Sequence, residues 1–261
     1  WIDLLSFEIE KLSSGLAAQD PYFDPVSPAW VYSGLVEKDN YEIFKFDLKL
    51  GLRFRLTHSP GYDGQPSFSQ DGRWIFYASG KQENSEIYVM RSDGSLATQL
   101  TFRKGREGAP SLSPDGSRLV WWGSPENRQD LADLYLADFD PRQPKLENVT
   151  QLTETSSMNL SPVWHPESKH VVFASNREAQ DNFELYILNL ESRCLQRITD
   201  SQGDDLMPHF SPDARYLTWS STFEGRSHIF MAPFSFSNAP CNASQIGTEL
   251  NKIRFKGVDG R

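Results

Sequence analysis

The sequence has no long apolar run and no dense block of basic residues. No stretch approaches the roughly 18 consecutive apolar residues that a membrane-spanning helix needs. The net charge is −9, whereas nucleic-acid binding requires clustered Lys and Arg to neutralise phosphates. These absences exclude a helical span and a nucleic-acid partner. The negative balance leaves room for a cation or a basic partner.

Cysteine is also scarce, with only Cys194 and Cys241 in the chain. They are far apart and not in C-x-x-C spacing, so a cysteine zinc site is not expected. We expect two separate thiols, although a fold that brings them together would allow a Cys194–Cys241 pair. The chain begins at Trp1 without a signal-peptide pattern, so its targeting cannot be inferred from its start.

What the sequence does contain is a repeat. With 38% apolar and 13% aromatic residues it can form a packed core. Five copies of one module align on a turn such as "SQDGRWIFYAS", and their first positions are 42, 44, 52 and 46 residues apart. These first positions are Ser27, Ser69, Ser113, His165 and Ser211. The first copy is expected to lack two residues of the turn.

Each module continues with an apolar stretch such as "SEIYVM" and then a triplet, "RLT", "QLT" or "RIT". From the Leu or Ile of the triplet, ten residues lead to Pro66, Pro110, Pro162 and Pro208. Val, Ile, Tyr, Phe and Trp dominate the runs, which Gly, Pro, Asp and Ser bound, so each module predicts four β-strands. In the Ser-Pro-Asp-Gly tip, Pro fixes φ, Asp bonds the backbone and Gly accepts positive φ. Four-stranded repeats of this length predict the blades of an all-β propeller.

We expect a single propeller domain over residues 1–261 with six blades, the sixth incomplete. Five blades with an appended N-terminal hairpin are the alternative. The modules are placed at about 20–57, 58–101, 102–153, 154–199 and 200–256, and residues 1–19 as half a blade. Residues 235–245 are expected to form a surface loop within the fifth module.

The stretches "PSFSQDGRWIFYAS", "PSLSPDGSRLVWWGS" and "PHFSPDARYLTWSS" resemble the TolB-type propeller repeat, a relative of the WD40-like repeat. The resemblance covers nearly the whole chain. It implies a propeller that serves as a periplasmic binding protein, as the gating domain of a peptidase or, in some members, as an enzyme. TolB proteins carry an extra α/β domain before the propeller, and no such segment appears in this sequence.

One set of polar residues recurs three positions before each strand-initiating proline. A propeller places equivalent loops around one mouth of its channel, so these residues predict a mostly acidic rim. Such a rim would bind Ca²⁺, another divalent cation, or Lys and Arg of a partner. The alternative is a ring of solvated polar residues. The set comprises Asp63, Glu107, Asn159 and Asp205. Asp259 in "GVDGR" occupies the equivalent position, in a linker that is one residue shorter.

Other residues give weaker signals. The sequence contains no G-x-S-x-G, H-E-x-x-H, P-loop or G-x-G-x-x-G motif. His165 replaces a tip serine and His209 lies in an innermost strand, so both are candidate channel contacts without an assigned metal. The tip aspartates Asp71, Asp115 and Asp213 are expected to serve their own turns. The tryptophans are expected to pack in the core.

We therefore expect a non-catalytic, monomeric binding platform that recognises a protein segment or small ligand at the channel mouth. The TolB resemblance implies a periplasmic or other envelope location, with a peptidoglycan-associated lipoprotein as the type of partner. The alternatives are a metal-assisted lyase or hydrolase acting on carbohydrate in the channel, and the propeller domain of a larger peptidase-like protein. An enzymatic activity is not favoured, and no cofactor beyond a divalent cation is implied.

Overall fold

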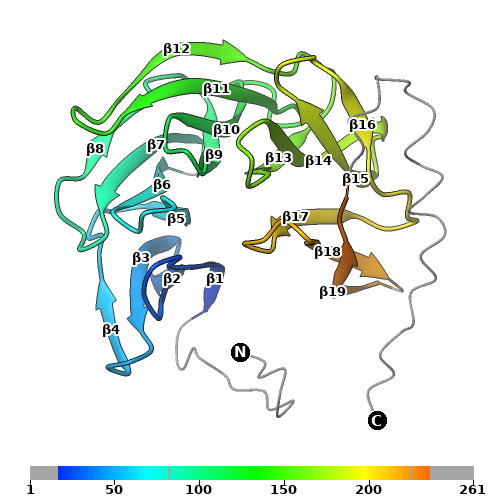
Figure 1. Cartoon of the computed structure of the whole chain (residues 1–261). Helices are drawn as coiled ribbons and strands as arrows, with labels where there is room; N and C mark the ends of the chain where they lie inside the picture. The colour runs from blue at the N-terminus through cyan, green and yellow to red at the C-terminus, as the bar shows by residue number, and fades with distance from the viewer. Residues whose placement is uncertain (1–16, 82, 224, 236–261) are drawn as a thin grey trace.

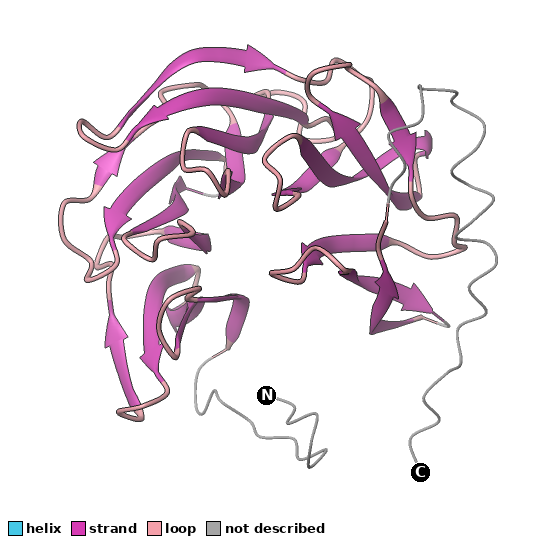
Figure 2. Ribbon diagram, in the orientation of Figure 1, coloured by secondary structure: helices cyan, strands magenta, loops and turns pink. Residues whose placement is uncertain are grey.

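The computed structural model describes residues 17–81, 83–223 and 225–235, and all regular elements in these ranges are β-strands (Figure 2). Within these ranges, no helix is long and apolar enough to cross a membrane. Asp259, Cys241 and most of the predicted 235–245 loop lie outside the described residues. The all-β class predicted from the repeat is confirmed.

The strands form five successive antiparallel units, which we call blades 1 to 5. Blade 1 contains β1 (Ala18–Phe23), β2 (Ala29–Glu37), β3 (Asn40–Asp47) and β4 (Leu52–Arg55). Blade 2 contains β5 (Tyr62–Phe68), β6 (Trp74–Lys81), β7 (Asn84–Arg91) and β8 (Thr98–Gln99). Blade 3 contains β9 (Arg106–Leu112), β10 (Arg118–Ser124), β11 (Asp133–Asp140) and β12 (Lys145–Gln151).

Blade 4 contains β13 (Asn159–Trp164), β14 (His170–Ala179), β15 (Asn182–Asn189) and β16 (Leu195–Arg197). The described part of blade 5 contains β17 (Asp205–Phe210), β18 (Tyr216–Phe223) and β19 (Arg226–Pro233). The blades follow one another along an arc about a common centre (Figure 1). The first strand of each blade, β1, β5, β9, β13 or β17, lies nearest that centre, and we call these the inner strands.

The hairpin tips form as the sequence predicts. In blade 2, Ser69 Oγ donates to Asp71 Oδ1 at 2.6 Å and accepts from the backbone N–H of Trp74 at 3.0 Å. The backbone N–H of Arg73 donates to the same carboxylate at 3.1 Å, and Gly72 takes φ 68°. The same pattern recurs at Asp115 and Asp213. These carboxylates therefore serve their own turns.

The first tip differs from the sequence alignment. It starts at Asp24, which takes the place of the tip serine and accepts from the backbone N–H of Val26 at 2.9 Å and of Ser27 at 3.2 Å. Counting from Asp24, the turn has its full length, so the expected loss of two residues is wrong. The alignment failed because Ser27-Pro28 imitates the Ser-Pro start of the other tips. Residues 18 and 19, predicted to end a half blade, belong to β1.

The recurrent triplets have a shared hydrogen-bonding role. In blade 2, Thr101 Oγ1 accepts from the backbone N–H of Ile87 at 2.8 Å and donates to Glu86 Oε2 at 2.8 Å. Gln99 Nε2 donates to the carbonyl oxygen of Thr101 at 2.8 Å. Each triplet thus ties the end of a blade to its third strand. The backbone-to-threonine bond recurs at Thr57, Thr153 and Thr199.

Apolar packing joins the blades face to face. Phe76 and Ile87 of blade 2 pack against Leu119 and Trp121 of blade 3, and equivalent clusters join the other described neighbours. Full burial of each such side chain contributes about 1.5–3 kcal/mol. The predicted core role of the tryptophans is confirmed at Trp74, Trp121, Trp164 and Trp219, which are at most 6% exposed.

The cysteine expectation fails at Cys194, because this residue is disulfide-bonded rather than a separate thiol. It lies just before β16, close to the end of blade 4.

The triplet threonine gives a test of this account. We expect Thr101→Val to destabilise the fold by about 1–3 kcal/mol, because the backbone N–H of Ile87 and the Glu86 carboxylate both lose a buried partner. Thr98→Val is the control, since that hydroxyl bonds only the exposed carbonyl of Leu96. Urea unfolding of both variants measures the difference, and equal stabilities would contradict the proposed role of the triplet.

Candidate functional site

The inner strands share an unusual backbone position. In each, the residue directly before the proline has positive φ, between 45° and 54°, and the strand register shifts there. Positive φ is uncommon outside glycine and persists only where surrounding structure enforces it. A bulge of this kind redirects the side chain. We call these residues the inner bulge residues: Asp20, Gln65, Ala109, Ser161 and Met207.

Hydrogen bonds connect these positions across blades 1 to 3. Gln65 Oε1 accepts from the backbone N–H of Ala109 at 2.8 Å, and the backbone N–H of Gln65 donates to Ser33 Oγ at 3.1 Å. Ser33 Oγ in turn donates to Asp20 Oδ2 at 3.3 Å. A side chain at Gly108 would clash with Gln65 Oε1, only 2.2 Å from the position of an added Cβ. The inner surface of these blades is therefore polar and held in a fixed arrangement.

Blades 1 and 5 also meet at the inner strands. The rings of Tyr22 on β1 and His209 on β17 contact edge to face, with centroids 6.1 Å apart. Part of His209 is exposed, yet the surrounding protein atoms lower the pKa of its imidazole by desolvation. Burial likewise raises the pKa of Asp20. An aspartate, a tyrosine and a histidine thus lie among the inner-strand side chains.

His165, the other histidine singled out by sequence, lies elsewhere. It is 4% exposed and packs against Phe210 and Phe234, with ring centroids 5.0 and 5.9 Å away. Burial lowers the pKa of this imidazole. Its surroundings are those of a core residue at the junction of blades 4 and 5.

The predicted rim residues occupy equivalent places, but they are buried. Each lies at the start of an inner strand and is at most 2% exposed, so none projects into solvent. Loop residues cover them; Ser59, for example, donates to Asp63 Oδ2. Binding of a ligand or cation by these positions stays a prediction. The described members are Asp63, Glu107, Asn159 and Asp205.

Asn159 shows what this position requires. Its Nδ2 donates to the carbonyl oxygen of Ala132 at 2.8 Å and to Thr155 Oγ1 at 2.9 Å, and its Oδ1 accepts from Ser175 Oγ at 2.9 Å. At the three acidic positions, one carboxylate oxygen has no hydrogen-bond partner. An ionised carboxylate only accepts, whereas an amide also donates. A protonated carboxyl group would supply the hydrogen-bond donor that the Asn159 amide supplies, and a bound cation would interact with the same unpartnered oxygen.

Glu107 is the acid most affected. Its Oε1 accepts from Trp121 Nε1 at 3.1 Å and lies 3.8 Å from the guanidinium of Arg103. Burial, reinforced by nearby Glu86, outweighs these contacts and raises the pKa of Glu107 to about 7. Near neutral pH this side chain exists in both protonation states.

The raised pKa predicts a pH dependence of stability. Between the ordinary carboxyl pKa of about 4.5 and a folded value of about 7, the folded state holds a proton that the unfolded state has released. The contribution of Glu107 is therefore full below pH 4.5 and is lost as pH rises through 7. We expect Glu107→Gln to flatten the fall in unfolding free energy from pH 5 to 8 by on the order of 2–3 kcal/mol.

Denaturant titrations at several pH values measure this difference. Glu126→Gln, at an exposed position, is the matched control and should keep the wild-type slope. A Glu107→Gln slope equal to wild type would mean that Glu107 is ionised throughout.

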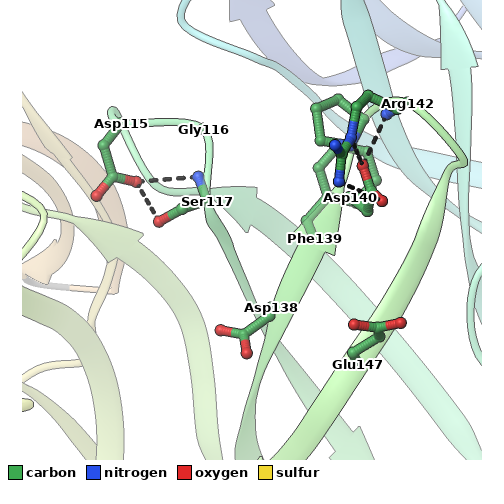
Figure 3. Close-up of a pocket in the computed structure, with 9 residues that line it drawn as sticks. Asp115, Gly116, Ser117, Asp138, Phe139, Asp140, Arg142 and Glu147 are labelled. Atoms are coloured by element: carbon green, nitrogen blue, oxygen red, sulfur yellow. Dashed lines mark hydrogen bonds and ion pairs between the residues drawn. The ribbon is translucent and has the colours of Figure 1, made fainter.

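A separate hollow of about 360 Å³ lies between the tip of blade 3 and the β11–β12 hairpin (Figure 3). Its lining includes Asp115, Asp138, Asp140, Arg142 and Glu147. Asp140 pairs with Arg142, and Asp115 bonds Ser117, so these groups already have partners. The hollow is not lined by inner-strand residues. Within the described residues, no three His, Cys, Asp or Glu side chains are grouped to hold a metal ion.

Repeated antiparallel blades around a centre define the chain as a propeller-type repeat protein, and comparison with known proteins gives its family. A family model described as "TolB beta propeller domain" matches residues 11–143 and 132–252. The chain belongs to this family.

Individual relatives are more distant. The Tol-Pal system protein TolB of Francisella tularensis subsp. mediasiatica is 26% identical over 104 residues, which are 40% of this chain and 23% of that protein. The match therefore spans about a quarter of the length of the curated relative.

Solved structures share the fold at low identity. TolB from Acinetobacter baumannii has a TM-score of 0.71 at 21% identity, covering 85% of this chain and 53% of that one. A putative TolB from Agrobacterium tumefaciens has a TM-score of 0.73 at 18% identity. The match covers 89% of this chain and 83% of that one. An oligogalacturonate lyase in complex with manganese has a TM-score of 0.61 at 14% identity. The match covers 90% of this chain and 70% of that one.

The inner bulge residues were missed in the sequence. Their types differ, from Asp and Gln to Ala, Ser and Met, so no shared side chain marks them. The only available signal was the proline that follows each one. Among the described residues singled out by sequence, His209 lies on the same inner surface.

Proposed function

We propose that this protein is a non-catalytic binding platform that recognises a protein segment or a small polar ligand at the inner surface of its propeller. The observation that carries the proposal is the recurrence, on the inner strand of each described blade, of one residue with the same positive-φ bulge conformation. A surface held in place before binding loses little conformational entropy when a ligand docks.

The family supports a location and a partner type. Relatives are named as Tol-Pal system proteins, which favours the periplasm or another compartment of the bacterial envelope. A peptidoglycan-associated lipoprotein is then the first partner to test, with this chain acting as a monomer.

The inner bulge residues make this proposal testable. We expect the double variant Asp20→Asn and Met207→Asp to bind the soluble domain of a peptidoglycan-associated lipoprotein at least about tenfold more weakly, a loss of ~1.4 kcal/mol. Isothermal titration calorimetry measures the affinity, and circular dichroism checks the fold. Glu126→Ala on the exposed surface is the control. Unchanged affinity of the double variant, with wild-type binding present, would remove the inner surface from the proposal.

An enzymatic role is the second candidate, because the lyase noted above shares the fold. A lyase acting on oligogalacturonate produces an unsaturated sugar that absorbs in the ultraviolet. Incubation of this protein with oligogalacturonate and Mn²⁺ therefore distinguishes the two: rising absorbance favours catalysis, and its absence together with lipoprotein binding favours the platform. Peptidase structures are also among the neighbours, so the role of a propeller domain in a larger peptidase-like protein remains the third candidate.

A cation could also bind at the buried acidic positions, since each carries an unpartnered oxygen. We expect the triple variant Asp63→Asn, Glu107→Asn and Asp205→Asn to lose calorimetric heat of Ca²⁺ binding that the wild type shows. The variant Asp115→Asn, in the tip of blade 3, should keep it. If the triple variant binds Ca²⁺ as the wild type does, these positions are not the cation site.

We further propose a ring of six blades rather than five. Blades 1 and 5 end the described arc (Figure 1), and their inner strands contact through the rings of Tyr22 and His209. In a five-bladed ring, β18 and β19 would pack against blade 1 as β14 and β15 pack against blade 5.

A further inference from the structure

The outer edge of blade 1 differs from the outer edges of blades 2 to 4. Its last strand, β4, pairs with β3 through four successive residues without a shift of register. Among the described strands β4 pairs with β3 alone, so the other side of its backbone is open, and all of its residues are exposed. Figure 1 shows β4 on the outside of the arc, at the lower left. An open strand edge is a template for a further strand.

The outer strands of blades 2 to 4 offer less to such a strand. β8 and β16 have two and three residues, and all of these are only partly exposed. β12 has seven residues, but its register shifts and Asn148 takes φ 53°, so the row of backbone groups is interrupted. Short edge strands and bulges discourage pairing with another chain. The exposed and unbulged β4 has neither protection.

Two kinds of side chain alternate along β4. Leu52 and Phe54 are 52% and 44% exposed, and they share one face of the strand. Arg53 and Arg55 lie on the other face. The guanidinium of Arg53 lies over the Phe44 ring, 5.2 Å from its centroid, and it forms no ion pair with a carboxylate of the described residues. The strand therefore offers two apolar groups and an unneutralised cation, in a chain of net charge −9.

The hydrogen-bonding groups on the open side of β4 belong to the two arginines. The backbone N–H of Leu56 donates to the carbonyl oxygen of Ile43 on β3 at 2.8 Å. Because these groups point alternately to the two sides of an antiparallel strand, those of Arg53 and Arg55 point away from β3. A strand added to this edge would therefore hydrogen-bond at Arg53 and Arg55 and place its own side chains opposite theirs.

This register decides between a second copy of the chain and a partner of opposite charge. Antiparallel pairing of two β4 strands through their outward groups places an arginine of one copy opposite an arginine of the other. Like charges directly opposite each other destabilise a strand pair, whereas opposite charges stabilise it. Arg55 already pairs with Glu42 at 2.7 Å, so the charge of Arg53 is the one left for a partner.

We propose that the open edge of β4 binds an extended acidic segment of a partner protein, which adds a strand to blade 1. An acidic side chain of the segment lies opposite Arg53, and its apolar neighbours lie opposite Leu52 and Phe54. In this mode of recognition, backbone hydrogen bonds give affinity and alternate side chains give specificity. The edge lies on the outside of the arc, so the proposal does not depend on ligand binding at the inner surface.

Hydrogen exchange of the backbone amides in the intact protein locates the added strand. The probe is a short fluorescein-labelled peptide in which Glu alternates with Val. At saturating probe, we expect the amides of Arg53 and Arg55 to exchange at least about fivefold more slowly, because a hydrogen-bonded amide must open before it exchanges. The amides of β12 should keep their rates.

Three results of this experiment would overturn the proposal. The first is an unchanged rate at Arg53 and Arg55. The second is equal slowing along β12, which would mean that the peptide does not select the β4 edge. The third is slowing that grows with protein concentration in the absence of peptide, which would assign the edge to a second copy.

A charge reversal tests the chemistry of the partner. By fluorescence anisotropy, we expect the wild type to bind the Glu peptide at least about tenfold more tightly than a peptide with Lys in place of Glu. Arg53→Glu should reverse this preference, and Lys145→Glu, the same reversal at an exposed position of β12, should keep it. Circular dichroism checks both folds. Equal affinity of the wild type for the two peptides, or an Arg53→Glu variant that still prefers the Glu peptide, would contradict the proposal.

Discussion

The structure depends on one constraint. Each blade has two apolar faces, and each blade must cover the apolar face that the preceding blade turns towards it. Ile43, Ile87, Leu134 and Leu185 lose all solvent contact only because another blade follows. A single four-stranded sheet of this kind could not bury both faces, so the repeat becomes stable only as a series. Constant spacing in the sequence is the consequence, since every module must place the same residues against the next.

The same constraint explains how a candidate site arises where the repeat carries no shared chemistry. Packing fixes the blades about a centre, and the bulge before each proline turns one residue per blade in the same way. The packed positions must stay similar, whereas the inner bulge positions are free to differ. Asp20, Gln65, Ala109, Ser161 and Met207 accordingly range from charged to apolar. Along each inner strand, the packed positions and the positions proposed for recognition are thus separated by only a few residues.

The sequence predicted what depends on local contacts. The tips around Asp71, Asp115 and Asp213 and the strand order formed as expected, because their hydrogen bonds join residues close in the chain. The bulges were missed because no shared side-chain type marks them. At Gln65 and Ala109 a hydrogen bond joins the bulge positions of two blades, a contact that local sequence does not reveal. Burial of Asp63 and Glu107 was missed for a related reason: equivalent register gives a residue its place around the centre but not its depth.

That depth changes the electrostatic picture of the centre. With Asp63, Glu107 and Asp205 covered by loops, much of the predicted acidity is withdrawn from the inner surface. Desolvation also raises the pKa values of Glu107 and Asp205 and so favours their neutral forms. The accessible inner surface is left with the amide of Gln65, the hydroxyl of Ser161, the thioether of Met207 and the imidazole of His209. The proposed recognition of a peptide segment would use such a mixed surface, since a peptide offers both hydrogen bonds and apolar side chains.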